Sequence, residues 1–190
     1  MLTERSPRKA ALSAEFRRSD LLTSLPVPAD ERLREQAKFI AGALEEGSGA
    51  RLHAGCAGFL RAAADFYGVE APGIRVLAAR PLRVREGGWA SELFGDYAPE
   101  TLQIRVWMRT AVRKQVTSFG TFLSTLCHEF CHHLDYQRFK FTDSWHTRGF
   151  YERTAALYHH ARGTSPKRLF WAPMSGGRWR INWVRTQRGS

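Results

Sequence analysis

Three residues of the segment LCHEFCHHLD have the types and the spacing of a zinc-binding motif. His128, Glu129 and His132 form the pattern H-E-x-x-H. In a helix the two histidines lie one turn apart on the same face, so both imidazoles can reach one Zn²⁺ ion. The glutamate lies beside that face, where it can accept a proton from a water molecule that the metal activates. The pattern therefore predicts a metal centre with hydrolytic chemistry.

The helix that carries this motif is predicted to be amphipathic. A rotation of about 100° per residue places Leu126 and Phe130 on the side away from the motif. We therefore expect the motif to face a cleft or solvent. His133 points away from the metal side and is interpreted as structural. Cys127 and Cys131 fall on the core side and are interpreted as buried thiols.

A catalytic zinc site needs a third protein ligand and an open position for water. His146 and Glu152 both follow the motif at a useful distance, in a helix predicted over His146–Ala161. His146 shares a side of this helix with the apolar Phe150 and Leu157, whereas Glu152 falls on the opposite side. We therefore favour His146 as the third ligand and keep Glu152 as the alternative.

Asp135 follows His132 by one helical turn and is a candidate for orienting a ligand histidine. A solvated carboxylate near the end of the helix is the equally weighted alternative. Further candidates for stabilising negative charge on a substrate, among which the sequence does not choose, are Tyr136, Tyr151, Tyr158 and Arg153.

The two motifs together resemble those of the SprT-like zinc metallopeptidases. HEFCHHLD, a loop and SWHTRGF are similar to the H-E-x-x-H of that family and its third histidine at the following helix. The resemblance implies a zincin-like fold and one Zn²⁺ per chain, held by His128, His132 and His146, with Glu129 as the general base. The sequence departs from the family at Thr147, where a glycine is usual. This departure leaves the identity of the substrate undetermined.

The resemblance also implies how a substrate would bind. It places the strand predicted over Thr101–Arg109 along the cleft, where it would hold an extended peptide by strand addition. No cysteine follows Cys131, so the C-terminal zinc ribbon that is frequent in the family is absent. We expect a zinc-dependent metalloendopeptidase that acts on a protein or peptide substrate.

Helices and short strands are predicted to position these residues, in an α+β fold. Helical periodicity and end signals indicate helices at Ala29–Glu46, Arg51–Tyr67, Ser118–Tyr136 and His146–Ala161. Strands are predicted at Ile74–Ala79 and Thr101–Arg109, with a turn at Glu86–Gly88. With the resemblance, the expected architecture is a small mixed or antiparallel sheet packed against the active-site helix and further helices.

The chain is divided into three parts by composition and periodicity. Residues 1–28 are expected to form a flexible basic arm, and residues 29–162 a zincin-like metallopeptidase domain. Residues 163–190 form a basic, Trp-rich extension that contains one or two short strands. We expect its tryptophans, Trp171, Trp179 and Trp183, to lie mostly in the core and its arginines to be exposed.

Positive charge is concentrated towards the C-terminal end. The 190 residues carry a net charge of +11, and no acidic residue follows Glu152. Such an excess attracts polyanions, and tryptophans can stack on bases. DNA or RNA is therefore an expected partner, with the candidate contacts Lys167, Arg168, Arg178, Arg180 and Arg185. The alternative function is a basic nucleic-acid-binding protein whose zincin-like core is structural or inactive.

The overall composition excludes several classes of protein. A hydrophobic share of 43% and a charged share of 25% exclude collagen-like, low-complexity and fully disordered chains. No apolar run reaches the roughly 18 residues of a membrane span, and the first twenty residues lack the apolar core of a secretory signal. Three cysteines fit a reducing compartment. We expect a cytoplasmic protein without a membrane partner.

Overall fold

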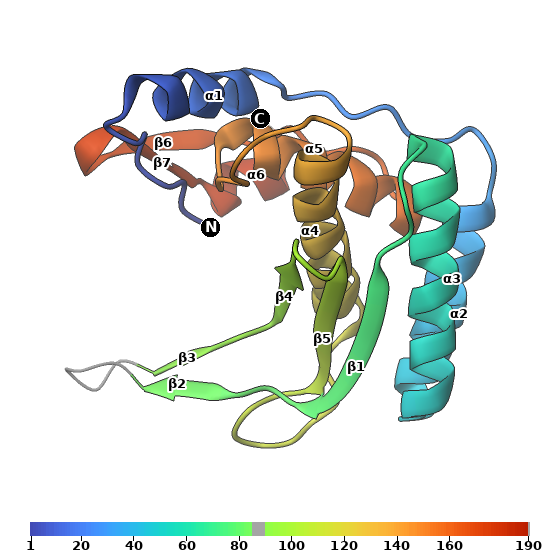
Figure 1. Cartoon of the computed structure of the whole chain (residues 1–190). Coiled ribbons are helices and arrows are strands. Elements are labelled where there is room, and N and C mark those ends of the chain that lie inside the picture. The colour runs from blue at the N-terminus through green and yellow to red at the C-terminus, as the bar shows by residue number, and fades with distance from the viewer. Residues whose placement is uncertain (85–89, 190) are drawn as a thin grey trace.

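Helices α3 and α4 pack against a small sheet in an α+β architecture (Figure 1). The computed structural model describes residues 1–84 and 90–189, so the turn expected at Glu86–Gly88 lies outside the described residues. The described helices are α1 (Ala10–Leu21), α2 (Arg32–Glu45), α3 (Gly49–Tyr67), α4 (Phe119–Gln137), α5 (Arg148–Arg162) and α6 (Trp183–Arg188). The described strands are β1 (Gly73–Ala79), β2 (Leu82–Val84), β3 (Ala90–Glu92), β4 (Gly95–Ala98), β5 (Gln103–Arg109), β6 (Trp171–Met174) and β7 (Arg178–Ile181).

Strand β5 lies in the middle of the three-stranded sheet, parallel to β1 and antiparallel to β4. Val76 of β1 and Tyr97 of β4 pair with Val106 and Ile104 of β5. Both edges of β5 are therefore hydrogen-bonded to neighbouring strands. The expectation that the strand at Thr101–Arg109 offers an edge to a peptide is wrong, because the unpaired edges of the described sheet belong to β1 and β4.

The core lies between helix α4 and the sheet. Leu126 and Phe130 of α4, like Ile104 and Val106 of β5, are fully buried. Burying such apolar side chains contributes about 1.5–3 kcal/mol each to folding. Every second residue of β5 is buried on this face, and Trp107 on the opposite face is buried as well. The central strand is thus covered on both sides, which fixes the base on which α4 rests.

Helix α4 begins and ends one residue later than predicted. Ser118 caps it by accepting a hydrogen bond from the Thr121 amide at 3.4 Å, so the orphan amides of the first turn gain a partner. Helix α5 begins at Arg148, after Thr147, whose hydroxyl accepts from the Phe150 amide at 3.0 Å. The prediction that this helix starts at His146 is therefore two residues too early.

The N-terminal segment, expected as a loose arm over residues 1–28, contacts the rest of the chain at several points. Leu2 forms a β-bridge with Arg180 of β7, and the buried Thr3 exchanges hydrogen bonds with Trp179. Helix α1 is joined to α5 through the ion pair of Asp20 with Arg148. These contacts between distant parts of the sequence attach the segment to the domain.

The C-terminal segment forms a β6–β7 hairpin followed by the short helix α6. It is attached to the domain through Leu169 and Ile181, which are part of the buried core. Trp183, expected in the core, is 44% exposed at the start of α6. The segment therefore packs against the rest of the chain through Leu169 and Ile181.

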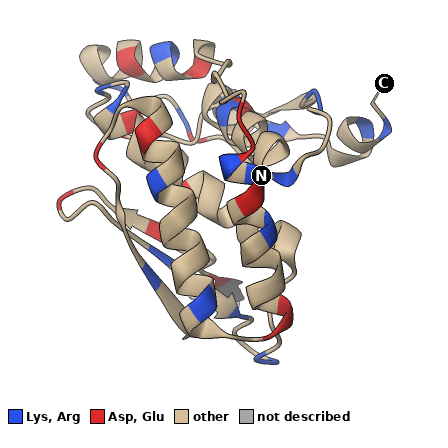
Figure 2. Cartoon of the chain, turned by 90° about the vertical axis from the view of Figure 1, so that its right-hand side faces the viewer, with Lys and Arg blue, Asp and Glu red and all other residues tan. Residues whose placement is uncertain are grey.

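Most basic residues of the C-terminal segment are exposed, and Figure 2 marks the positions of Lys and Arg along the ribbon. Lys167, Arg168, Arg180 and Arg185 are exposed, and Arg178 is half-buried. The segment has no acidic residue that could neutralise them. Within the described ranges, no helix combines the length and the apolar character needed to cross a membrane.

Candidate metal centre

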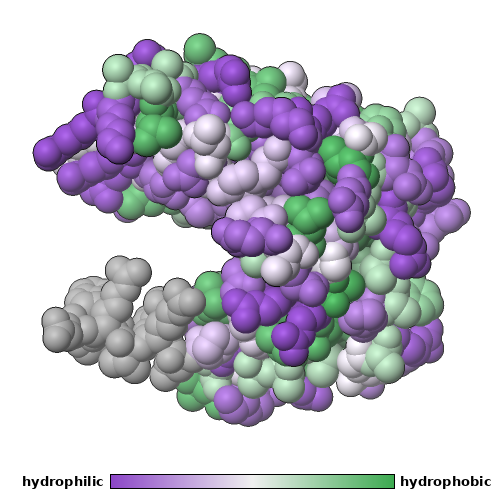
Figure 3. Space-filling model, viewed as in Figure 1, coloured by the Kyte–Doolittle hydropathy of each residue, from purple (hydrophilic) through white to green (hydrophobic). Residues whose placement is uncertain are grey.

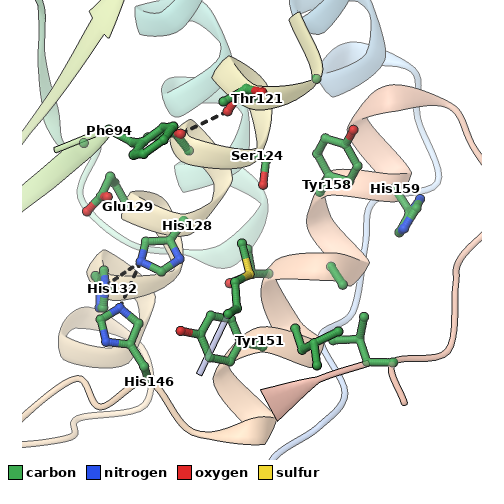
Figure 4. A pocket seen from close by; sticks show the side chains of 18 of the residues that line it. Phe94, Thr121, Ser124, His128, Glu129, His132, His146, Tyr151, Tyr158 and His159 are labelled. Atoms are coloured by element: carbon green, nitrogen blue, oxygen red, sulfur yellow. Dashed lines mark hydrogen bonds between the residues drawn. The ribbon is translucent and has the colours of Figure 1, made fainter. Parts of the chain in front are cut away.

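Three histidines meet at one side of helix α4 (Figure 4). The Nε2 atom of His128 lies 3.1 Å from Nε2 of His132 and 3.0 Å from Nε2 of His146. The three ligand atoms all lie within 4.8 Å of one another. His128 and His132 come from one face of α4, as the helical spacing predicts. The structure therefore brings together the three histidines that the sequence singled out.

His146 reaches this cluster from the loop that precedes helix α5, and not from the helix itself. Its backbone carbonyl accepts a hydrogen bond from the amide of Glu4 at 3.0 Å. Phe150, in the first turn of α5, packs its ring against His132 and His146, with centroid separations of 4.5 and 5.2 Å. The apolar stripe of α5 thus borders the third histidine, as expected, while the capped helix start sets its position.

Hydrogen bonds on the far side of two rings determine which nitrogen faces the cluster. Nδ1 of His132 lies 2.7 Å from Oγ of Ser144, whose hydroxyl donates to Asp135 at 2.8 Å. Ser144 therefore accepts from the Nδ1–H of His132. Nδ1 of His146 donates in the same way to the carboxylate of Glu4 at 2.6 Å. In its neutral form, each ring held in this way presents an unprotonated Nε2 to the cluster.

This donor set fits Zn²⁺. Lone pairs that face one another at about 3 Å repel unless a positive charge lies between them, and tetrahedral zinc binds neutral imidazole nitrogens at about 2.0–2.1 Å. Burial lowers the pKa of His128 to about 3 and that of His132 well below its usual value. Both rings are therefore neutral at pH 7, which is the form that binds a metal.

Asp135 is fully buried, so the alternative of a solvated carboxylate is wrong. Burial raises its pKa to about 6, while the guanidinium of Arg153 acts in the opposite direction. Arg153, itself 1% exposed, donates to Asp135 at 2.7 Å and to the carbonyl of Leu22 at 2.6 Å. Asp135 therefore acts on His132 through Ser144, and Arg153 belongs to this buried network and not to the groove.

Glu129 lies beside the histidines and lines the same groove. No hydrogen bond joins its carboxyl to another described residue. Burial raises its pKa to about 8, and the charge of Asp96 acts in the same direction. Strand β4 passes close to this side chain because it has a glycine there: a Cβ on Gly95 would lie 2.9 Å from Glu129 and 2.7 Å from Thr125. The carboxyl thus has room for water and is positioned between strand and helix.

The histidines open into a large groove of about 1500 Å³. Its walls come from β4, from α4 and α5, and from the N- and C-terminal segments, including Met1 and Trp183. The space-filling view displays a deep hollow beneath the terminal segments (Figure 3). A groove of this size admits an extended polypeptide, not only a small molecule.

Several residues considered from the sequence lie elsewhere. Glu152 accepts a hydrogen bond from the indole of Trp171 at 3.0 Å and is not near the histidines. His133 is buried and bonded to the hydroxyl of Tyr97 and the carbonyl of Glu70. The thiols of all three cysteines are buried. These assignments agree with the structural interpretation of His133 and of the cysteines.

The tyrosines considered for stabilising negative charge on a substrate differ in where they lie and in whether their hydroxyls are already bonded. Tyr136, Tyr151 and Tyr158 all line the groove. The hydroxyl of Tyr151 is already engaged, because it donates to the carbonyl of Leu2 at 3.2 Å. Tyr136 follows His132 by four residues on α4, whereas Tyr158 lies further along α5 than Tyr151 (Figure 4).

Sequence reasoning missed three residues of the site, namely Glu4, Ser144 and Gly95. A glycine within a strand is a sequence signal of close backbone approach, so Gly95 was accessible in principle. Glu4 and Ser144 carry no comparable signal, since their roles depend on how distant segments pack.

The comparisons with known proteins give no match: no family model, no curated protein and no solved structure is similar to this chain.

Proposed function

We propose that the protein is a zinc-dependent metallopeptidase with a zincin-like, SprT-like catalytic core. The observation that carries the proposal is the convergence of His128, His132 and His146, with the carboxyl of Glu129 beside them in one groove. Three neutral imidazoles and an open side are the ligand set of a catalytic zinc site. A zinc ion held there supplies positive charge that acidifies a water molecule and polarises a peptide carbonyl.

Glu129 then has the role of general base. Burial raises its pKa to about 8, and the positive charge of a bound zinc ion would lower it again, so that the carboxylate could accept a proton of water and pass it to the leaving amine. The other ring nitrogens of His132 and His146 are held by Ser144 and Glu4, which orient both rings. This chain therefore provides both the ligand geometry and the acid–base group that hydrolysis requires.

The free edge of β4 supports a peptide substrate. Gly95, Asp96 and Tyr97 line the groove directly beside Glu129. An extended peptide that pairs with this edge gains backbone hydrogen bonds and places a carbonyl next to the histidines. Strand β4 thus takes the role that the sequence assigned to Thr101–Arg109.

Metal analysis and one catalytic substitution test the proposal. We expect about one Zn per chain in the wild type and in Glu129→Gln, because Glu129 is not a ligand. Glu129→Gln should reduce cleavage of an unfolded protein by at least about 100-fold. His146→Ala should lose zinc, whereas the matched Glu152→Ala should keep it. Undiminished proteolysis in Glu129→Gln would contradict the proposal.

A second candidate function is nucleic-acid binding by the C-terminal segment. The guanidinium groups of Arg168 and Arg185 lie 5.4 and 4.7 Å from the ring of Phe170, and Trp183 is largely exposed. Cations interleaved with aromatic rings can bind phosphates and stack on bases. This function does not depend on the metal centre.

Binding of a labelled single-stranded DNA or RNA at several salt concentrations tests this candidate. Removal of two phosphate contacts in Arg168→Gln/Arg185→Gln should weaken binding and lower the salt dependence by about two counterions. Lys38→Gln/Arg61→Gln removes the same charge from exposed positions on α2 and α3 and serves as the control. Equal binding by both double variants would exclude the C-terminal segment as the binding surface.

A further inference from the structure

One face of helix α5 lines the groove along the full length of the helix. Tyr151, Thr154, Tyr158 and Arg162 recur every three or four residues and therefore lie on the same side. Tyr151 stacks on the ring of His146 at 5.8 Å, so this face starts at the histidine cluster. The groove accordingly continues past the cluster and follows α5 to its last residue.

Helix α4 forms the opposite wall and runs antiparallel to α5. Its residues His128 and His132 lie near the start of α5, whereas Gly120 lies near the end. The side chain of Arg162 extends over Gly120, since a Cβ there would be 2.7 Å from an Arg162 nitrogen. Ser124 lies between these two ends, on the groove side of α4 (Figure 4). The two helices thus form a channel that begins at the histidines and ends at Arg162.

The far end of this channel carries unneutralised positive charge. Arg162 and Lys167 both line it, and neither forms an ion pair within residues 1–84 and 90–189. His159, which also lines this end, has its pKa lowered by burial and by the charges of Lys167 and Arg162. The electrostatic field of both cations therefore extends into the channel at the position of His159.

At the other end of the groove, beside β4, the charges of the carboxylates and arginines balance. The carboxylates of Glu92 and Asp96, which line it beside β4, are each paired with an arginine. The partners are Arg80 for Glu92, at 2.9 Å, and Arg105 for Asp96, at 2.6 Å. The electrostatic difference between the two ends thus comes from Lys167 and from Arg162, whose guanidinium donates to the hydroxyl of Tyr158 and keeps its full charge.

The length of the channel sets the position at which a substrate would meet these cations. From Tyr151 to Arg162 the helix advances 11 residues, or about 16 Å at roughly 1.5 Å per residue. An extended peptide advances about 3.3 Å per residue, so about five residues span the same distance. The reach of the Arg162 and Lys167 side chains shortens this span to about four.

We propose that the channel selects polypeptide substrates with an acidic side chain about four or five residues from the cleaved bond, held by Arg162 and Lys167. This inference rests on the proposed peptidase function and adds the substrate class. The selectivity is electrostatic, so it acts on glutamate, aspartate and phosphorylated side chains alike, and it weakens as salt screens the exposed charges.

A panel of fluorogenic peptides that differ only in the position of one glutamate tests the inference. The zinc-loaded wild type should cleave the peptide with glutamate four or five residues from the bond about tenfold faster than its glutamine counterpart. Two exposed charge pairs, each with roughly a threefold effect, account for this ratio. Arg162→Gln/Lys167→Gln should bring the ratio close to one. The charge-matched Lys38→Gln/Arg61→Gln should keep it.

Comparing two peptides within each variant cancels differences in the amount of folded enzyme. A second measurement uses zinc-loaded Glu129→Gln, which should bind the acidic peptide more tightly than the neutral one at low salt. A wild type that cleaves all peptides of the panel equally would overturn the inference and leave the peptidase function standing. A zinc-loaded wild type that cleaves none of them would overturn both.

Discussion

Glu4 offers a sharp test of how the third histidine is held. Its carboxylate accepts the Nδ1 proton of His146 at 2.6 Å, and its own amide donates to the carbonyl of the same residue. We expect Glu4→Gln to weaken zinc binding, because a neutral amide accepts the imidazole proton less strongly and orients the ring less firmly. Glu4→Ala, which removes the acceptor, should weaken it further.

The expected loss of zinc affinity in Glu4→Gln depends on how far the side chains of Glu4 and His146 are exposed to water. Loss of a hydrogen-bond partner behind a metal ligand typically reduces metal affinity by about 10–100-fold. The side chains of Glu4 and His146 are 46% and 31% exposed, so water can replace part of the lost interaction. We therefore expect the lower end of this range for Glu4→Gln, about tenfold, which corresponds to roughly 1.4 kcal/mol.

Competition with a chromophoric zinc chelator at fixed pH measures this affinity without relying on catalysis. Glu45→Gln, an exposed glutamate on α2, is the matched control and should bind zinc as the wild type does. Thermal unfolding of the metal-free proteins checks that neither substitution disturbs the fold. Zinc affinity of Glu4→Gln and Glu4→Ala within twofold of the wild type would refute the role assigned to Glu4.

Three further substitutions probe the framework around the site. Arg153→Met should lower the free energy of unfolding by about 3–5 kcal/mol, because it leaves Asp135 buried without its partner; denaturant unfolding that shows no loss would contradict this. Glu92→Gln should lower stability at pH 7 but not well below pH 4. The hydrogen bond from Arg80 lowers the pKa of Glu92 below its usual value, so the stabilisation is present above pH 4.5 and disappears as the pH falls through the folded-state pKa. Gly149→Ala should cost about 3 kcal/mol in thermal unfolding, since its Cβ would meet backbone oxygens of α1.

The local parts of the site could be predicted from the sequence. The spacing of His128 and His132 depends only on helical geometry, and α4 differs from its predicted bounds by one residue at each end. His146 was identified as the third histidine although its place in a helix was not correct. The prediction rested on the apolar side that His146 shares with Phe150, and the Phe150 ring does pack against His146 at 5.2 Å.

The remaining parts depend on contacts between distant segments. Glu4 lies 142 residues before His146, and no periodicity or motif connects them. Strand β4 has a free edge and β5 has none because β5 also pairs in parallel with β1. The pattern of apolar and polar residues within one strand does not reveal which strands will pair. The burial of Asp135 likewise depends on Arg153, eighteen residues later. Patterns within a helix or strand predict that element, whereas tertiary packing decides what surrounds it.

The attachment of Thr3 to Trp179 has a consequence for biosynthesis. These two residues are separated by 176 positions, and the bond between them holds the segment that carries Glu4 to His146. During translation the three clustered histidines leave the ribosome before the β6–β7 hairpin does. The contact between Thr3 and Trp179 can therefore form only after the hairpin has been synthesised, so the segment that carries Glu4 gains this attachment late in translation.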